Sequence, residues 1–165
     1  MDFLSSLRRE HIPLLELMGE RGRAAFEKLS AGTPVPFGYK MGFHALPSMR
    51  QLHLHVISND FISARLKTWH HYNSFATQFF RPLESVIEQL RTTGKVEVRN
   101  TALRDLSCSY TCSLLTAMQF DAQEYKTINY MSRAPCCHCG ATLDTFPALQ
   151  KHLLDHFKRS TASSR

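Results

Sequence analysis

Two histidines separated by one residue carry the clearest chemical signal in the chain. His53 and His55 lie in the segment SMRQLHLHVISND (48–60), between bulky apolar residues. Alternate side chains of a β-strand share a face, so a strand here would point both imidazoles one way and the flanking leucines the other. Burying imidazoles is costly unless they have partners. The pattern therefore predicts a pocket lined by histidine side chains.

A third histidine is expected beside this pair. FGYKMGFHA (37–45) alternates like a strand and ends close to His44, and QLHLHVIS (51–58) follows as the next strand. A short turn between two strands indicates an antiparallel pair, which brings His44 towards His53 and His55. Neutral imidazole is a nucleophile towards phosphorus at neutral pH. On spacing alone, catalysis, a metal site and a structural histidine pair all remain open.

The C-terminal segment carries a second chemical pattern. Its cysteines and histidines have the spacing Cys136-x2-Cys139-x12-His152-x3-His156. A CxxC turn presents two thiolates to one ion, and histidines four residues apart share one face of a helix. The pattern predicts a Cys2His2 zinc finger with one structural zinc ion. The alternative is a cysteine-rich turn followed by an ordinary helix with two surface histidines.

Residues near the four candidate ligands favour the finger. Leu143 and Leu149 stand where fingers of this spacing place two core residues, and the small fold would use metal binding to offset its chain entropy. Cys137 and His138 are expected outside the metal's coordination shell. Basic residues on or beside the ligand helix favour contacts with phosphate, although a structural or protein-binding finger is the alternative; these residues are Lys151, Lys158 and Arg159.

Helices are expected on both sides of the hairpin. Residues 5–29 carry apolar side chains at helical spacing, with Pro13 near the helix start. Residues 69–80 are rich in aromatic side chains and are predicted to form a loop and a short helix. Residues 82–94 predict a helix that stops at Gly94.

These elements predict an α+β fold, in which a partial, histidine-triad-like antiparallel sheet with flanking helices precedes a small Cys2His2 finger. Residues 100–134 show no clear period and are predicted to form an irregular connection. The expected division is 1–99 for the catalytic domain, 100–134 for the connection, 135–159 for the finger and 160–165 for a frayed tail.

Composition narrows the function classes. The 165 residues are 43% hydrophobic and 21% charged, a globular composition, and the apolar runs are far shorter than a membrane span. The net charge of +6 favours a polyanionic partner such as nucleic acid. Five cysteines, three of them clustered, suit a metal site in a reducing compartment better than a disulfide framework.

Three segments together resemble one known family. GFHALPSMRQLHLHVISNDF, the following LK…HHYNSF and the terminal finger are similar, in this order, to the aprataxins, the DNA-repair branch of the histidine-triad superfamily. The resemblance implies a nuclear hydrolase that removes AMP from 5′-adenylated DNA ends left by abortive ligation. It implies DNA, and also DNA-repair proteins, as partners. The alternative is a catalytically impaired zinc-finger module that binds nicked or damaged DNA.

The resemblance also implies a role for individual residues. His53 holds the position of the nucleophile that carries a covalent AMP. His55 matches the histidine that contacts the phosphate and stabilises charge in the transition state. His44 matches a histidine near the leaving phosphate, and Ser48 matches a phosphate-contacting serine.

Three departures from the family pattern carry expectations of their own. Gln51 replaces the first histidine of the triad and keeps its hydrogen-bonding capacity but not its positive charge. His70 stands where a phosphate-binding lysine is expected, which predicts weaker substrate binding or a sharper pH dependence. The family fold has strands upstream of residues 5–29, so an N-terminally shortened sheet with an exposed edge is expected.

Overall fold

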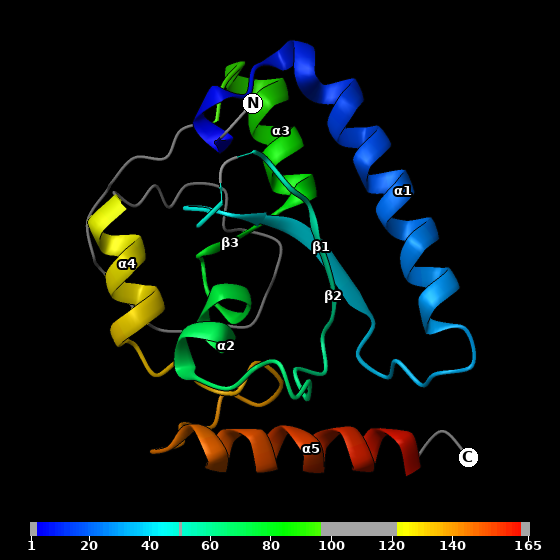
Figure 1. Cartoon of the computed structure of the whole chain (residues 1–165), viewed down its shortest axis with the longest axis vertical. Helices are drawn as coiled ribbons and strands as arrows, with labels where there is room; N and C mark the ends of the chain where they lie inside the picture. The colour runs from blue at the N-terminus through cyan, green and yellow to red at the C-terminus, as the bar shows by residue number, and fades with distance from the viewer. Residues whose placement is uncertain (1–2, 50, 97–121, 163–165) are drawn as a thin grey trace.

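The computed structural model describes residues 3–49, 51–96 and 122–162, with the backbone alone for 122–125. Two short 3₁₀ turns, Leu4–Ser6 and Arg9–His11, precede the first helix. The other elements follow in the order α1 (Ile12–Ser30), β1 (Tyr39–His44), β2 (His55–Ser58), α2 (Trp69–Ala76), β3 (Phe80–Pro82), α3 (Leu83–Thr93), α4 (Ala122–Met131) and α5 (Phe146–Ala162) (Figure 1).

The strands form one antiparallel sheet in the order β2-β1-β3. In the central strand, Gly42 pairs with His55 on one side and with Pro82 on the other. The predicted hairpin and the α+β fold are confirmed. β3 was not predicted, because three residues are too short for an alternating pattern to be recognised.

One face of the sheet packs against α1 and α3, which lie side by side in Figure 1. Met41 and Phe43 point into this core, and Leu54 and Val56 pack against its edge. Because strand side chains alternate, the opposite face of β1 and β2 carries His44 and His55. The buried residues of this core are Leu4, Leu7, Leu15, Met41, Phe43, Leu83, Val86, Leu90 and Val96.

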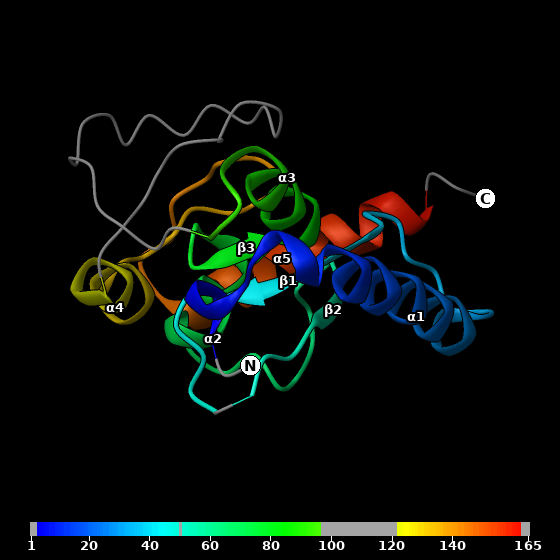
Figure 2. The same ribbon diagram turned by 90° about the horizontal axis from the view of Figure 1, so that it is seen from above.

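A second core joins the C-terminal segment to the rest of the chain. Phe61 and Tyr72, from the segment after β2 and from α2, pack against the buried side of α5, which includes Leu149 and Leu153. Figure 1 shows α5 lying beneath α2, and Figure 2 shows it crossing under the sheet. The finger is therefore anchored to the histidine-bearing part of the molecule.

The predicted helix ends agree with the structure in part. α1 begins at Ile12 with Pro13 in its first turn. Gly94 caps α3 with a φ of 77°, in the left-handed region that glycine enters without strain. None of the helices in the described ranges combines the length and the hydropathy that a membrane-spanning helix needs.

Three expectations are corrected by the structure. β2 begins at His55 and not at residue 51, since Gln51 has a φ of 75°, which breaks the extended backbone, and residues 52–54 lie outside the ladder; His53 therefore precedes the strand on which it was predicted. Within 100–134, residues 122–131 form α4, which is stabilised by packing on α2 and not by a local sequence pattern. Residues 160–162 extend α5 into the expected tail. Residues 97–121 lie outside the described ranges.

Gly42 lies where β1 passes close to β3, and we expect Gly42→Ala to destabilise the fold by about 3 kcal/mol. A Cβ there would overlap the Arg81 carbonyl oxygen and lie 2.7 Å from the Phe80 ring. Gly19→Ala is the matched control, because its Cβ would meet only the flexible end of Leu83. Urea unfolding midpoints measure the difference, and equal midpoints for the two variants would contradict this packing.

Candidate functional site

Three imidazole rings meet beside the face of the sheet that is opposite to α1 and α3. His44 ends β1 and His55 begins β2, and their ring centroids are 4.1 Å apart. The His53 ring lies 4.7 Å from that of His55. The structure thus brings together the three histidines that the sequence singled out, here called the histidine cluster.

The hydrogen bond of His53 determines which ring nitrogen is available. Its Nδ1 lies 3.0 Å from the Gln51 carbonyl oxygen. A carbonyl can only accept a hydrogen bond, so Nδ1 carries the proton and Nε2 keeps its lone pair in the neutral ring. The contact uses the backbone of Gln51, not the side-chain amide that the sequence comparison had emphasised.

Burial keeps the other two imidazoles neutral. It lowers the pKa of His44 to about 3, helped by the nearby rings of His55, His53 and His70. Burial and the neighbouring His53 lower the pKa of His55 to about 4. The Nε2 atoms of His44 and His55 have no hydrogen-bond partner among the described residues. Both nitrogens are buried, so their hydrogen-bonding capacity is unused among the described residues.

Aromatic rings form one side of the histidine cluster. Phe75 lies 4.9 Å from the His44 ring and 5.4 Å from the His55 ring, centroid to centroid. Phe79 lies 5.3 Å from His44. Lys40 donates to the Phe75 carbonyl at 2.7 Å and so ties the end of α2 to β1. This apolar wall accounts for the low pKa values of the two histidines.

The three candidate phosphate ligands lie in different surroundings. His70, on α2, stacks on Tyr130 of α4 with centroids 4.1 Å apart and lies close enough to lower the pKa of His44. Its Nδ1 is buried without a hydrogen-bond partner in the described residues. Ser48 is exposed in the loop after β1, and the Gln51 side chain is exposed as well. No described contact joins Ser48 to the histidine cluster.

Stability is expected to fall as pH is lowered from about 6.5 towards 4. The unfolded chain protonates His44 and His55 near 6.5, whereas the folded chain does so only near 3 and 4. The unfolded state therefore binds more protons in this window. Each ring then lowers the free energy of unfolding by at most about 1.4 kcal/mol per pH unit, and by less because both rings are partly exposed.

Urea unfolding of the wild type and of His55→Gln at several pH values measures this effect. Both chains keep the same finger, so acid release of a metal affects them equally. We expect a shallower decline for the variant. Parallel declines for the two chains would show that His55 is not buried as a neutral ring.

The four predicted metal ligands also come together. One donor atom from each of Cys136, Cys139, His152 and His156 lies within 4.8 Å of the others. His152 Nε2 is 3.1 Å from Cys139 Sγ and 3.2 Å from His156 Nε2. Two thiols and two imidazoles converging in this way fit a tetrahedral ion such as zinc, and the arrangement has room for one metal ion.

Cys137 and His138 lie outside this set, as predicted. Burial raises the pKa of the Cys137 thiol to about 11. The His138 ring instead stacks on Phe37, with centroids 4.0 Å apart. Leu149 is buried in the core of the finger, and Leu143 packs against it, so both predicted core positions are confirmed.

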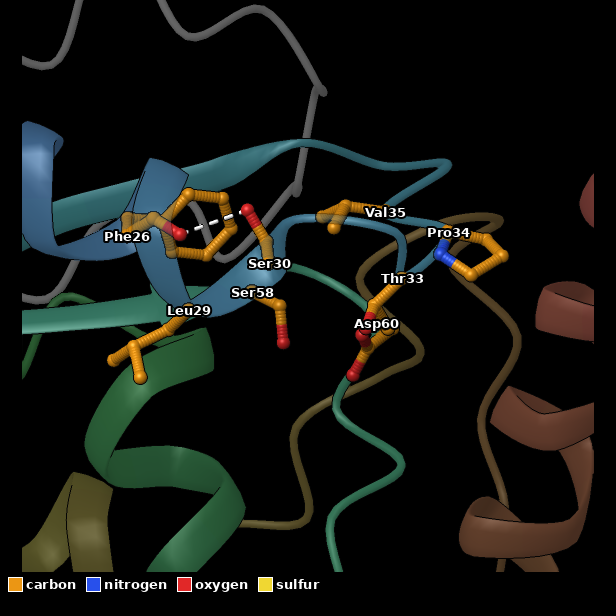
Figure 3. A pocket seen from close by; sticks show the side chains of 8 residues that line it. All are labelled: Phe26, Leu29, Ser30, Thr33, Pro34, Val35, Ser58 and Asp60. Carbon is orange, nitrogen blue, oxygen red and sulfur yellow. Dashed lines mark hydrogen bonds between the residues drawn. The ribbon is translucent and has the colours of Figure 1, made fainter.

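A cleft lies elsewhere on the molecule and contains none of these candidates. It has a volume of about 280 Å³ and opens at the C-terminal end of α1, where Ser30 donates to the Phe26 carbonyl at 2.8 Å (Figure 3). Ser58 and Asp60 line it from the end of β2. The three rings of the histidine cluster lie apart from this cleft and are only partly exposed.

Sequence reasoning did not single out the residues that connect these parts. Asn73 is fully buried and donates to the carbonyls of Asn129 and Ser132, at 3.1 and 2.8 Å, at the end of α4. Tyr72 is fully buried as well and reaches the cysteine turn of the finger. Both residues lie in the HHYNSF segment that carries part of the family resemblance, but nothing in that segment predicts their contacts with α4 or with the finger.

Comparisons with known proteins agree with both halves of the chain. Residues 76–159 match the family described as C2HE / C2H2 / C2HC zinc-binding finger, and residues 1–71 match the family described as scavenger mRNA decapping enzyme C-term binding. Aprataxin from Gallus gallus is 38% identical over 94% of this chain. The chain belongs to the aprataxin family. Aprataxin from Danio rerio is 33% identical over 93% of the chain.

These two matches cover nearly all of this chain but less than half of each aprataxin. The chain spans 41% of the length of the Gallus gallus aprataxin and 39% of that from Danio rerio. The solved structure of the aprataxin ortholog Hnt3 from Schizosaccharomyces pombe aligns with a TM-score of 0.62 at 21% identity, covering 97% of this chain and 72% of that one. This structural likeness establishes the histidine-triad-like fold.

Proposed function

We propose that this aprataxin-family chain is a DNA-repair hydrolase that removes AMP from 5′-adenylated DNA ends. The observation that carries the proposal is the orientation of His53. Its Nδ1 donates to the Gln51 carbonyl at 3.0 Å, which leaves Nε2 as the nucleophilic nitrogen, beside the neutral rings of His55 and His44. Membership of the aprataxin family supports the same chemistry.

In the first step, His53 Nε2 attacks the phosphorus of the AMP group. A nitrogen–phosphorus bond forms, and the bond from that phosphorus to the bridging oxygen of the pyrophosphate breaks. The DNA leaves with a 5′-phosphate. His55 Nε2 donates to a non-bridging oxygen of the AMP phosphate, and His44 lies beside the leaving phosphate. Both neutral rings can donate without bringing an extra proton into the site.

In the second step, water attacks the same phosphorus and the nitrogen–phosphorus bond breaks. AMP leaves and His53 regains its free Nε2. A covalent intermediate divides one difficult displacement into two easier ones. His70, with its unpartnered Nδ1, and Ser48 and Gln51 are proposed to contact phosphate groups of the substrate.

The finger is proposed to hold one structural zinc ion and to bind DNA through phosphate contacts. The four-ligand cluster and the zinc-binding finger family support the metal. A related structure is described as Hnt3 in complex with DNA and guanosine. The exposed basic side chains on α5, together with the net charge of +6, support binding of a polyanion. On this proposal the protein acts in the nucleus, alongside other DNA-repair proteins.

The direct test is AMP release from a 5′-adenylated nicked duplex, followed by chromatography. Release of AMP together with a 5′-phosphate on the DNA would support the proposal. Binding of the duplex without release of AMP would favour the second candidate, a zinc-finger module that recognises damaged DNA.

Lys158→Ala is expected to weaken duplex binding uniformly across sequences and to lower the slope of log Kd against log salt by about 1. The reason is the loss of one phosphate contact on the exposed side of α5. Fluorescence anisotropy across a salt series measures the slope. Lys28→Ala, at the end of α1, is the matched control. Equal slopes for the two variants would place the DNA elsewhere.

A further inference from the structure

We propose that Tyr72, which belongs to the histidine-bearing part of the chain, positions the cysteine turn that holds the metal in the finger. Its hydroxyl donates to the Pro135 carbonyl at 3.0 Å and accepts from the Cys137 backbone N–H at 2.8 Å. These two groups lie immediately before and after Cys136, a metal-ligand candidate. Tyr72 is therefore a positioning residue for that ligand and does not touch the metal.

The hydroxyl satisfies groups that the cysteine turn itself does not. Within the turn, the Gly140 N–H donates to the Cys136 carbonyl at 2.8 Å, and the His138 N–H points to Cys136 Sγ at 3.4 Å. The described hydrogen bonds give the Cys137 N–H the Tyr72 hydroxyl as its acceptor. Leaving a buried backbone group unpaired is costly. Tyr72 therefore fixes the peptide planes on both sides of the Cys136 thiol.

The ring of Tyr72 is held as firmly as its hydroxyl. The residue is fully buried, and its ring contacts Phe61 at 5.4 Å and Trp69 at 6.4 Å between centroids. Trp69 in turn contacts Phe146 of α5 at 5.6 Å. Because α2 is packed on both sides, the hydroxyl presents a fixed donor and acceptor to the finger. Metal affinity of the finger is thereby coupled to the folding of α2.

This coupling has a consequence for the histidine cluster. A metal that binds only the folded finger also stabilises the elements on which the finger packs, including α2. Tyr72 and His70 lie on the same helix, and His70 lies close enough to His44 to lower its pKa. Metal binding therefore favours the arrangement of α2 that keeps His70 beside the histidine cluster.

The test is the zinc affinity of Tyr72→Phe, measured by competition with a chromophoric chelator. The variant keeps the buried ring and loses the hydroxyl alone. Partners of metal ligands typically contribute 10- to 100-fold to affinity, so we expect the zinc Kd to rise by about 10-fold. Tyr39→Phe is the matched control, since the Tyr39 ring stacks on Phe26 in the other core and no hydrogen bond of its hydroxyl is described. Its zinc Kd is expected to equal that of the wild type.

If Tyr72→Phe folds poorly without metal, the rate of zinc release from the zinc-loaded variant provides a second measurement. The zinc-loaded variant is mixed with excess chelator, and faster zinc release than from the Tyr39→Phe protein is expected. Hydrogen exchange at the Cys137 amide should also be faster in the zinc-loaded variant. Unchanged affinity, release rate and exchange would overturn the role of Tyr72. No step uses DNA or AMP, so failure of the proposed hydrolase activity would leave this result unaffected.

Discussion

His53→Ala is expected to lower the rate of AMP release from a 5′-adenylated nick by at least about 10³-fold, because removing a nucleophile eliminates the covalent route. The His53 side chain is partly exposed and is oriented by a backbone carbonyl on the surface of the molecule. The variant should therefore keep the wild-type unfolding midpoint. Single-turnover assays with enzyme in excess measure the chemical step directly.

His11→Ala is the matched control for this experiment. His11 lies next to the start of α1, where its Nδ1 accepts from the Arg8 backbone N–H at 2.8 Å, outside the histidine cluster. Its rate of AMP release is expected to stay within about twofold of the wild type. If His53→Ala and His11→Ala retain equal activity, another group is the nucleophile.

Cys136→Ser is expected to reduce bound zinc from about one ion per chain to well below one and to lower the thermal midpoint by more than about 10 °C. Cys136 is fully buried in the core that joins α5 to Phe61 and Tyr72. Losing the metal therefore disrupts that core as well as the finger. Elemental analysis and calorimetry on the same samples measure both effects.

Cys137→Ser makes the same atomic change one residue along the chain. Because Cys137 lies outside the four-ligand cluster, this variant should retain about one zinc ion. It should show a smaller loss of stability, from its partly buried position. Equal zinc loss in the two variants would show that Cys137 is also needed to hold the metal and that the assigned ligand set is incomplete.

Local spacing was sufficient to predict that the four candidate metal ligands come together and that His53 lies near His55. The i, i+4 and CxxC patterns depend only on helix and turn geometry. Strand alternation predicted His53 and His55 on one strand face, whereas the strand begins only at His55 and His53 precedes it. The structure brings all of these groups together. His44 required one further step, the assumption of an antiparallel pair, which the pairing of β1 with β2 confirms, although residues 45–54 form a longer connection than the short turn that was predicted.

The remaining features depend on contacts between distant parts of the chain. The left-handed backbone of Gln51 turns its carbonyl towards His53. A glutamine residue does not predict such a conformation. α4 depends on Asn73, which is more than fifty residues away along the chain. Tyr72 reaches the finger over a similar separation. Tertiary hydrogen bonds of this kind leave no period in the sequence.

The most direct test of the central claim is to trap the covalent intermediate. The zinc-loaded chain is mixed with a 5′-adenylated nicked duplex, quenched at high pH within the first turnover, and digested for mass spectrometry. The account predicts AMP attached to the peptide that contains His53, and no adduct in His53→Ala. An adduct on another residue, or AMP release without any adduct in either chain, would contradict it.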